Sequence, residues 1–312
     1  MSLRTLGTSG LMTPPLVLGG NVFGWTVEGA DGFAVLDAFV AGGGTMIDSA
    51  DVYSAWVPGH KGGESETWLG EWLRRRGRRD DVLIATKVGM LPGGLKPARI
   101  ADAVEGSLKR LGTDYIDLYY AHRDDEVVPI ADVLGAFGRL IEAGKVRAIG
   151  ASNFSAERLA ASLDLSEAEG LPTYAVLQPE YNLLSRDRFP PDLQALCSER
   201  NIGVLPYFGL AAGFLTGKYR TEADLANSTR GRRMGSKLDT RGLAVLAAMD
   251  AVAAETGASL AQIALAWLAA QPAITAPIAS ATSVAQVEEL LGATRLVLGA
   301  EQLARLTAAS GV

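Results

Sequence analysis

The stretch GSLKRLGTDYIDLYYAH, residues 106–122, shows the unit from which the chain is built. Its first half completes an amphipathic helix predicted over 98–112, and Gly112 stands where a left-handed residue commonly ends a helix. The segment 115–121 is a continuous apolar run, as in strands that are buried on both faces of a parallel sheet. His122 follows directly, so we expect an imidazole at the carboxyl end of this strand.

The same alternation of apolar runs and helical stretches continues along the chain. Strands are predicted at residues 16–19, 45–49, 82–88, 115–121, 146–152, 174–179, 202–208 and 273–279. Helices are predicted at residues 33–42, 65–76, 98–112, 130–144, 155–170 and 192–200. Most strands recur about every 30 residues, the length of a βα unit, and eight such units close into a barrel. We therefore predict an α/β fold, a (β/α)8 TIM barrel in which residues 1–312 form a single domain.

Helix-end signals agree with these elements. Ser155 is predicted to be the N-cap of the helix that follows it. Glycines follow four of the helical runs, at positions that suit a left-handed residue; they are Gly42, Gly112, Gly144 and Gly170.

Two features depart from a bare barrel. Residues 3–15 carry Gly7 and Gly10 between two short extended pieces, which predicts an N-terminal β-hairpin that plugs the N-terminal mouth. The interval between the seventh and eighth strands is twice the usual one and contains the polar stretch 221–237, and a loop of that size is usually functional. A doubly wound sheet is the alternative fold, but the first strand is not followed by G-x-G-x-x-G.

Composition argues against several classes of protein. Of the 312 residues 48% are apolar, yet no run of about 18 apolar residues without charge predicts a membrane span. The N-terminus lacks an apolar signal-peptide core and Cys197 is the only cysteine, so we expect a cytoplasmic protein and a core role for Cys197. A net charge of −6 argues against nucleic acid as a partner. The basic cluster 74–79 is predicted to be a solvated helix C-terminus.

Four polar residues are expected at the carboxyl ends of three neighbouring strands. Asp48 ends the second strand and Tyr53 lies in the loop after it, while Lys87 is near the end of the third strand and His122 just past the fourth. In a barrel of this type these strand ends share one mouth, where chemistry collects. Alone, Asp48 could merely cap a turn and Tyr53 could merely pack. Their combination with a lysine inside an apolar strand favours a catalytic site.

The charges of these residues indicate general acid chemistry. A free phenol has a pKa of about 10, and the ammonium of Lys87 is expected to lower the pKa of Tyr53. Asp48 can pair with Lys87 and keep it charged in a partly dry site. Tyr53 could then donate a proton to a carbonyl oxygen that His122 orients. None of these side chains supplies a hydride, so a nicotinamide cofactor is required, and no metal is expected.

At these residues the sequence resembles the aldo-keto reductase family, over nearly the whole chain. The similar segments occur in family order; they are IDSADVY (47–53), GGESETWLG (62–70), ATKV (85–88), GSLKRLGTDYIDLYYAH (106–122), IGASNFS (149–155), LQPEYNLLSR (177–186) and FLTGKY (214–219). The match to bacterial members with a long loop after strand seven is especially close. The resemblance implies a barrel that binds NADPH and a tetrad in which Tyr53 is the proton donor.

The resemblance also implies positions for the cofactor. Ser152, Asn153 and Gln178 would hydrogen-bond the nicotinamide carboxamide, and Tyr207 would stack under the ring. Leu210, Gly213, Leu215 and Lys218 match the segment that covers the pyrophosphate, where backbone N–H groups near glycine can approach phosphate. Further positions expected at the cofactor are Gly20, Asn21, Phe208, Gly209 and Ala279. Arg232 could either reach the cofactor phosphates or be solvated. Phe208 stands where many members carry a serine, so one hydroxyl contact is expected to be missing.

The adenosine end departs most from the family pattern. Ser280, Thr282 and Leu290 replace glycine, arginine and asparagine, while Gln286 and Glu289 still fit. Arginine is the usual bidentate partner for a 2′-phosphate, so its replacement by Thr282 weakens the preference for NADP(H). Hydroxyl groups and helix N–H groups could still hold a phosphate. NADPH/NADP+ remains the expected cofactor, with NADH less favoured.

The substrate is expected to be a small carbonyl compound or the corresponding alcohol. Trp25, Tyr53, Trp56 and His122 come from loops at the mouth, which predicts an aromatic, partly apolar substrate pocket. The predicted function is reduction of aldehydes or ketones, or the reverse reaction, by a monomer or a weak homo-oligomer. Two alternatives stay open: a cofactor-binding regulatory subunit of the same fold, like family members that serve as channel subunits, and a different barrel enzyme such as an isomerase.

Overall fold

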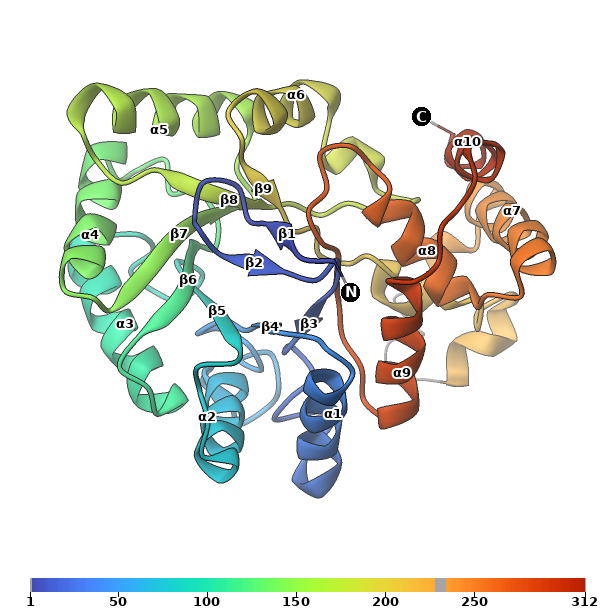
Figure 1. Ribbon diagram of the computed structural model, residues 1–312, viewed down its shortest axis with the longest axis horizontal. Helices are drawn as coiled ribbons and strands as arrows, with labels where there is room; N and C mark the ends of the chain where they lie inside the picture. The colour runs from blue at the N-terminus through green and yellow to red at the C-terminus, as the bar shows by residue number, and fades with distance from the viewer. Residues whose placement is uncertain (1, 228–233, 312) are drawn as a thin grey trace.

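Eight parallel strands form one sheet that curls on itself, as the computed structural model in Figure 1 shows for residues 2–227 and 234–311. Its spatial order is β10-β3-β4-β5-β6-β7-β8-β9. The strands are β3 (Val17–Gly19), β4 (Met46–Asp48), β5 (Leu83–Val88), β6 (Ile116–Ala121), β7 (Val146–Ser152), β8 (Tyr174–Gln178), β9 (Gly203–Val204) and β10 (Ile278–Ala279). Each predicted strand is present, and neighbours in the chain are neighbours in the sheet. This order excludes the doubly wound alternative.

Backbone hydrogen bonds join the two edges of the sheet. The N–H of Thr275 donates to the carbonyl of Val204 at 2.9 Å, and the N–H of Ile278 donates to the carbonyl of Pro206 at 2.9 Å. The arrangement is consistent with the predicted (β/α)8 barrel. Both edge strands are shorter than predicted, because Pro206 and Pro277 lack the N–H group that a longer ladder requires.

Helices cover the outer face of the sheet (Figure 1). They are α1 (Gly29–Ala41), α2 (Glu64–Arg76), α3 (Pro97–Leu111), α4 (Ile130–Glu142), α5 (Ala156–Glu169), α6 (Pro191–Glu199), α7 (Thr240–Thr256), α8 (Leu260–Ala269), α9 (Val284–Ala293) and α10 (Ala300–Ala309). The six predicted helices match α1 to α6, although α1 begins four residues earlier than predicted. Among the described residues no single helix is long and apolar enough to cross a membrane; α7 and α8 pass that test only as a pair bent by 96°.

The described part of the long interval between β9 and β10 is not an unstructured loop. It contains the short 3-10 helices η2 (Ala211–Thr216), η3 (Glu222–Asn227) and η5 (Gly235–Lys237), followed by α7 and α8. Arg232 falls in the part of this interval that lies outside the described residues.

The predicted N-terminal hairpin is present and closes one end of the sheet. Strands β1 (Arg4–Thr5) and β2 (Met12–Thr13) pair antiparallel, and Leu6 and Leu11 belong to the apolar cluster inside the sheet. Gly7 has a φ of +54°, and a Cβ there would lie 2.2 Å from the carbonyl oxygen of Ala175. Glycine therefore lets the hairpin approach the start of β8 closely.

Most of the helix-end predictions are confirmed. The Ser155 hydroxyl accepts from the N–H of Arg158, and Gly112, Gly144 and Gly170 all have positive φ. The prediction for Gly42 is wrong, because its φ is −77° and the left-handed residue is the next glycine, at position 43.

Candidate active site

The strand register brings the four predicted tetrad residues to one end of the sheet. Asp48 is the last residue of β4, Lys87 is the penultimate residue of β5, and His122 follows the end of β6. Tyr53 belongs to the turn that follows β4. Since the strands are parallel, all four side chains meet where the carboxyl ends of the strands converge.

Lys87 is the centre of the tetrad. Its Nζ donates to Oδ2 of Asp48 at 2.5 Å, to the backbone carbonyl of Ser49 at 2.7 Å and to the hydroxyl oxygen of Tyr53 at 2.8 Å. The Tyr53 hydroxyl in turn donates to Oδ2 of Asp48 at 3.3 Å. Lys87 is fully buried and Asp48 is 2% exposed. A buried ammonium is tolerated here because three acceptors surround it.

The pKa shifts correct one prediction. Burial and the carboxylate of Asp48 raise the pKa of Tyr53 well above the ordinary value for a phenol, so the expected lowering by Lys87 is wrong for this site. Burial also lowers the pKa of Lys87, although Asp48 opposes that shift. The anion next to Tyr53 offsets the effect of the ammonium, and the phenol keeps its proton at neutral pH. A retained proton is what a proton donor requires.

His122 is a neutral imidazole at neutral pH. Burial, and then the charge of Lys87, lower its pKa well below 6.5. The side chain is 8% exposed, and its ring centroid lies 6.0 Å from that of Tyr53. Its Nδ1 has no hydrogen-bond partner in the described part of the chain. A neutral ring beside the phenol can hydrogen-bond an oxygen atom without adding charge.

A chain of polar side chains continues from the tetrad across β7 and β8. Nε2 of Gln178 donates to Oδ1 of Asp48 at 2.9 Å, and the Ser152 hydroxyl donates to the carbonyl of Gln178 at 2.8 Å. Asn153, at a φ of +58° that asparagine tolerates well, donates to the carbonyl of His122 at 3.0 Å. The Tyr207 hydroxyl donates to Oδ1 of Asn153 at 2.7 Å.

A cavity of about 910 Å³ extends from the tetrad toward α9. Most of the predicted site residues line it; they are Asn21, Asp48, Tyr53, Trp56, His122, Ser152, Asn153, Gln178, Tyr207, Phe208, Gly209, Leu210, Gly213, Lys218, Ala279, Ser280, Thr282, Gln286 and Glu289. Its middle section has an unusual backbone, because Ala211, Ala212 and Gly213 all have positive φ. The Lys218 ammonium lies beside Gly213, within 3.4 Å of the position a Cβ would take there. Such a turn and a cation suit a phosphate group.

The far end of the cavity is formed around the start of α9. Oε1 of Gln286 accepts from the N–H of Thr282 at 2.8 Å, and the Ser280 hydroxyl donates to Oδ1 of Asn21 at 2.6 Å. Glu289 adds a carboxylate to the lining. Among the described residues, Lys218 is the only lysine or arginine in this lining.

Four predicted residues of the described part do not line the cavity, and one of them is Lys87, which is fully buried beneath Tyr53 and Asp48. Leu215 is fully buried in the core, and Gly20 lies behind the wall with its N–H bonded to the carbonyl of Asp48 at 2.7 Å. Trp25 packs edge to face against Trp56, with the two ring centroids 5.7 Å apart. Leu290, named from the sequence at the adenosine end, also lines the cavity. Sequence reasoning missed several lining residues; they are Gly19, Val22, Thr26, Val52, Met90, Ala212, Thr216, Ala261 and Ile278. Most of these are apolar or small, and only their position next to predicted strand ends could have indicated them.

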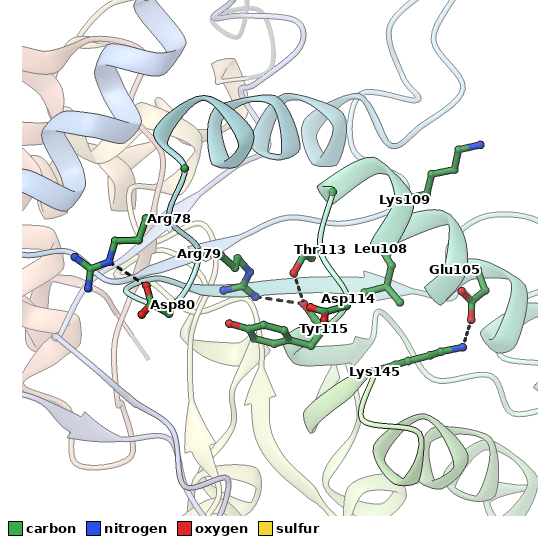
Figure 2. Close-up of a pocket in the computed structure, with 12 residues that line it drawn as sticks. Arg78, Arg79, Asp80, Glu105, Leu108, Lys109, Thr113, Asp114, Tyr115 and Lys145 are labelled. Carbon is green, nitrogen blue, oxygen red and sulfur yellow. Dashed lines mark hydrogen bonds and ion pairs between the residues drawn. The ribbon is translucent and has the colours of Figure 1, made fainter.

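A second, shallower depression lies at the opposite end of the sheet, next to the basic cluster 74–79 (Figure 2). Arg78 pairs with Asp80 there, and Lys145 pairs with Glu105. Arg79 donates to the carbonyl of Tyr115. The prediction of a solvated helix C-terminus holds for part of the cluster only, since several of its cations bind carboxylates and carbonyls.

The comparisons with known proteins agree with this geometry. The sequence profile described as "Aldo/keto reductase family" matches residues 15–310. The chain belongs to the aldo/keto reductase family. This membership supports an oxidoreductase that acts on carbonyl groups of small molecules.

Relatives of this aldo/keto reductase come from several kingdoms. Aldo-keto reductase str7 of Strobilurus tenacellus is 34% identical over 92% of this chain and 83% of its own length. Aldo-keto reductase yakc [NADP(+)] of Schizosaccharomyces pombe is 34% identical over 82% of this chain and 75% of its own length. A probable voltage-gated potassium channel subunit beta of Oryza sativa subsp. japonica is 32% identical over 95% of this chain and 92% of its own length.

Proposed function

We propose that this aldo/keto reductase is an NAD(P)H-dependent enzyme that reduces aldehydes or ketones to alcohols, or runs the reverse reaction. The observation that carries the proposal is the buried ammonium of Lys87, which contacts Asp48 and the hydroxyl of Tyr53 at the head of a large cavity. A protonated phenol beside a neutral imidazole is suited to a carbonyl oxygen that gains negative charge.

Each tetrad residue has a distinct role in this proposal. Tyr53 donates its proton to the carbonyl oxygen, and Lys87, at 2.8 Å, stabilises the phenolate that remains. Asp48 keeps Lys87 charged despite burial, while neutral His122 hydrogen-bonds the substrate oxygen. Trp56 and Met90, both 48% exposed at the cavity, would contact the apolar part of the substrate, and Trp25 would support Trp56.

The cavity has polar groups suited to a dinucleotide along its length. A bound nicotinamide dinucleotide supplies the hydride. Asn153 and Gln178 could hold its carboxamide, together with Ser152, and the ring of Tyr207 could support the nicotinamide. The turn at Ala211–Gly213 and Lys218 suit the two phosphates.

We favour NADPH over NADH as the cofactor, although the adenosine end lacks the usual arginine. Thr282 and the N–H groups that open α9 could hold a 2′-phosphate. Glu289 favours NADH instead, since its carboxylate would repel the 2′-phosphate of NADPH. Comparing kcat/KM with NADPH and NADH at equal concentration tests this, and a preference for NADH would overturn it.

The reaction itself is tested by a fluorescence titration with NADPH, followed by oxidation of NADPH with 4-nitrobenzaldehyde. Saturable binding and turnover are expected. Absence of NADPH binding and of NADH binding would overturn the proposal.

The second candidate function is that of a cofactor-binding regulatory subunit. It is supported by similarity to the plant protein named as a probable potassium channel subunit beta. The complete tetrad argues against it. Tight cofactor binding with no detectable turnover over a wide aldehyde panel would favour this candidate.

Three further expectations belong to the same proposal. We propose that the chain acts as a single domain, that it functions in the cytoplasm, and that it is especially similar to bacterial members with a long loop after strand seven. Gel filtration of the purified chain would test whether it is a monomer or a weak homo-oligomer.

A further inference from the structure

A second group of buried charges lies behind the tetrad, on the outer side of the sheet. Side chains alternate along β5, so Lys87 points to the tetrad while Thr86 points to Glu66 of α2. The group consists of Asp51 and Glu66, with exposures of 1% and 0%, and of two arginines from α3, Arg99 and Arg110. The proposed mechanism uses none of them.

The two carboxylates are held very differently. Glu66 accepts from Thr86 at 2.5 Å through one oxygen and from Nε of Arg110 at 2.7 Å through the other. Asp51 accepts from Arg99 at 2.8 Å through Oδ2, whereas its Oδ1 is buried with no hydrogen-bond partner in the described residues. Asp51 is therefore the carboxylate of the two whose hydrogen-bond acceptors are only partly satisfied.

Asp51 is also the member that lies closest to the catalytic groups in the chain. Its N–H donates to the backbone carbonyl of Lys87 at 3.1 Å, and Tyr53 follows two residues later in the same turn. The ion pair with Arg99 fastens this turn to α3. A change in the charge of Asp51 thus acts on the segment that carries Tyr53 and on the backbone of Lys87.

The surroundings of Asp51 bring its ionisation into the physiological range. Burial and the carboxylate of Glu66 raise the pKa of Asp51 to about 6, while Arg99 and Arg110 oppose the rise. The remaining titratable groups that face it are Tyr119 on β6 and Lys87 on β5. Burial keeps the phenol of Tyr119 neutral, because it raises the pKa of that group well above its ordinary value.

We propose that Asp51 is a positioning residue whose negative charge, paired with Arg99, holds the Tyr53 turn and supports the buried ammonium of Lys87. Protonation of Asp51 removes one of the carboxylates that stabilise Lys87 and weakens the tie between the turn and α3. Turnover then decreases as the medium is acidified. The inference rests on the proposed carbonyl reduction.

The test is the pH dependence of kcat between pH 5 and 8, with 4-nitrobenzaldehyde and NADPH, for the wild type, Asp51→Asn and Asp117→Asn. Asp117 is a matched control, since it is 1% exposed and paired with Arg79 and Arg147, but at the opposite end of β6. The wild type should lose activity on the acid side with a midpoint near pH 6. Asp51→Asn should lack this acid limb and have a kcat about tenfold lower at pH 7.5, with KM within about twofold, as expected for misplaced catalytic groups.

Asp117→Asn should keep the wild-type pH profile. The proposal is overturned if Asp51→Asn keeps the acid limb, or if Asp117→Asn loses it as well. Should Asp51→Asn fail to fold, Arg99→Gln removes the ion pair from the other side. Loss of that cation should move the acid limb about one unit to higher pH, and an unmoved limb would overturn the proposal.

Infrared spectroscopy separates this proposal from the proposed function. Between pH 5 and 7 the wild type should lose a carboxylic acid C=O band, and Asp51→Asn should lack that band. If the band titrates but no variant turns over any aldehyde, the reductase function fails and the catalytic role of Asp51 fails with it. If turnover is present and the acid limb is unchanged in Asp51→Asn, only the inference about Asp51 fails.

Discussion

Replacing Tyr53 by phenylalanine removes a single oxygen atom from the site, and the contacts of that oxygen set the change in the free energy of unfolding. The ammonium of Lys87 loses one of its three acceptors but keeps Asp48 at 2.5 Å and Ser49 at 2.7 Å. The buried charge remains compensated, so the free energy of unfolding should change by about 1 kcal/mol or less. For a chain of this length that corresponds to a Tm shift of about 2 °C.

The catalytic cost should be far larger than the structural one. A positioned general acid contributes about 10²–10⁴-fold, which corresponds to about 3–5 kcal/mol of barrier. We therefore expect kcat of Tyr53→Phe with 4-nitrobenzaldehyde to fall by that factor, while the Kd for NADPH, measured by fluorescence, stays within about twofold.

Tyr174→Phe is the matched control for this experiment. Tyr174 is 2% exposed and begins β8, so it lies at the end of the strand away from the tetrad. Its replacement should leave kcat nearly unchanged. A Tyr53→Phe variant that retained more than about a tenth of wild-type kcat would refute the assignment of the proton donor.

Two further predictions concern stability. Lys87→Met leaves the Asp48 carboxylate buried without its cation and should cost about 3–5 kcal/mol in urea unfolding, whereas Lys87→Met with Asp48→Leu should recover part of that loss; a double variant no more stable than the single one would contradict this. The pKa of Asp51 is raised from 3.8 to about 6 by folding, so the folded state binds the proton more tightly and the resulting stability is lost as pH rises through 6. Relative to Asp51→Asn, the wild type should therefore lose up to roughly 3 kcal/mol between pH 4 and 7, and a constant difference would show that Asp51 does not titrate there.

The sequence predicted the fold well where the spacing of apolar residues matched only one kind of element, a strand or a helix. The strand 82–88 and the helix 98–112 were located within two residues, because apolar runs and helix-end glycines agreed. Helices α7, α8, α9 and α10 have no counterpart among the six predicted helices. Seven of the ten residues of α8 are buried, so it shows no polar stripe by which helical periodicity could be recognised.

The sequence indicated which polar residues the strand ends bring together, but not the electrostatics of the group that they form. A lysine within an apolar strand required a partner, which led directly to Asp48. The direction of the pKa shift of Tyr53 depended on whether burial and Asp48 outweighed Lys87, and only the geometry decides that balance. Asp51 was missed because an acidic residue after a strand resembles an ordinary turn residue. Its burial arises from α2 and α3, which are distant from it in the sequence.

The closed end of the sheet has a consequence for how the protein can change. Leu6 and Leu11 fill that end, and the ion pairs of Asp117 fasten neighbouring strands there. The contacts that stabilise the fold are thus concentrated at the closed end of the sheet, and the candidate catalytic residues lie at the opposite end. The loops at the carboxyl ends of the strands can therefore change in length or sequence, and substrate specificity with them. Such changes leave the contacts that hold the strands together at the closed end in place.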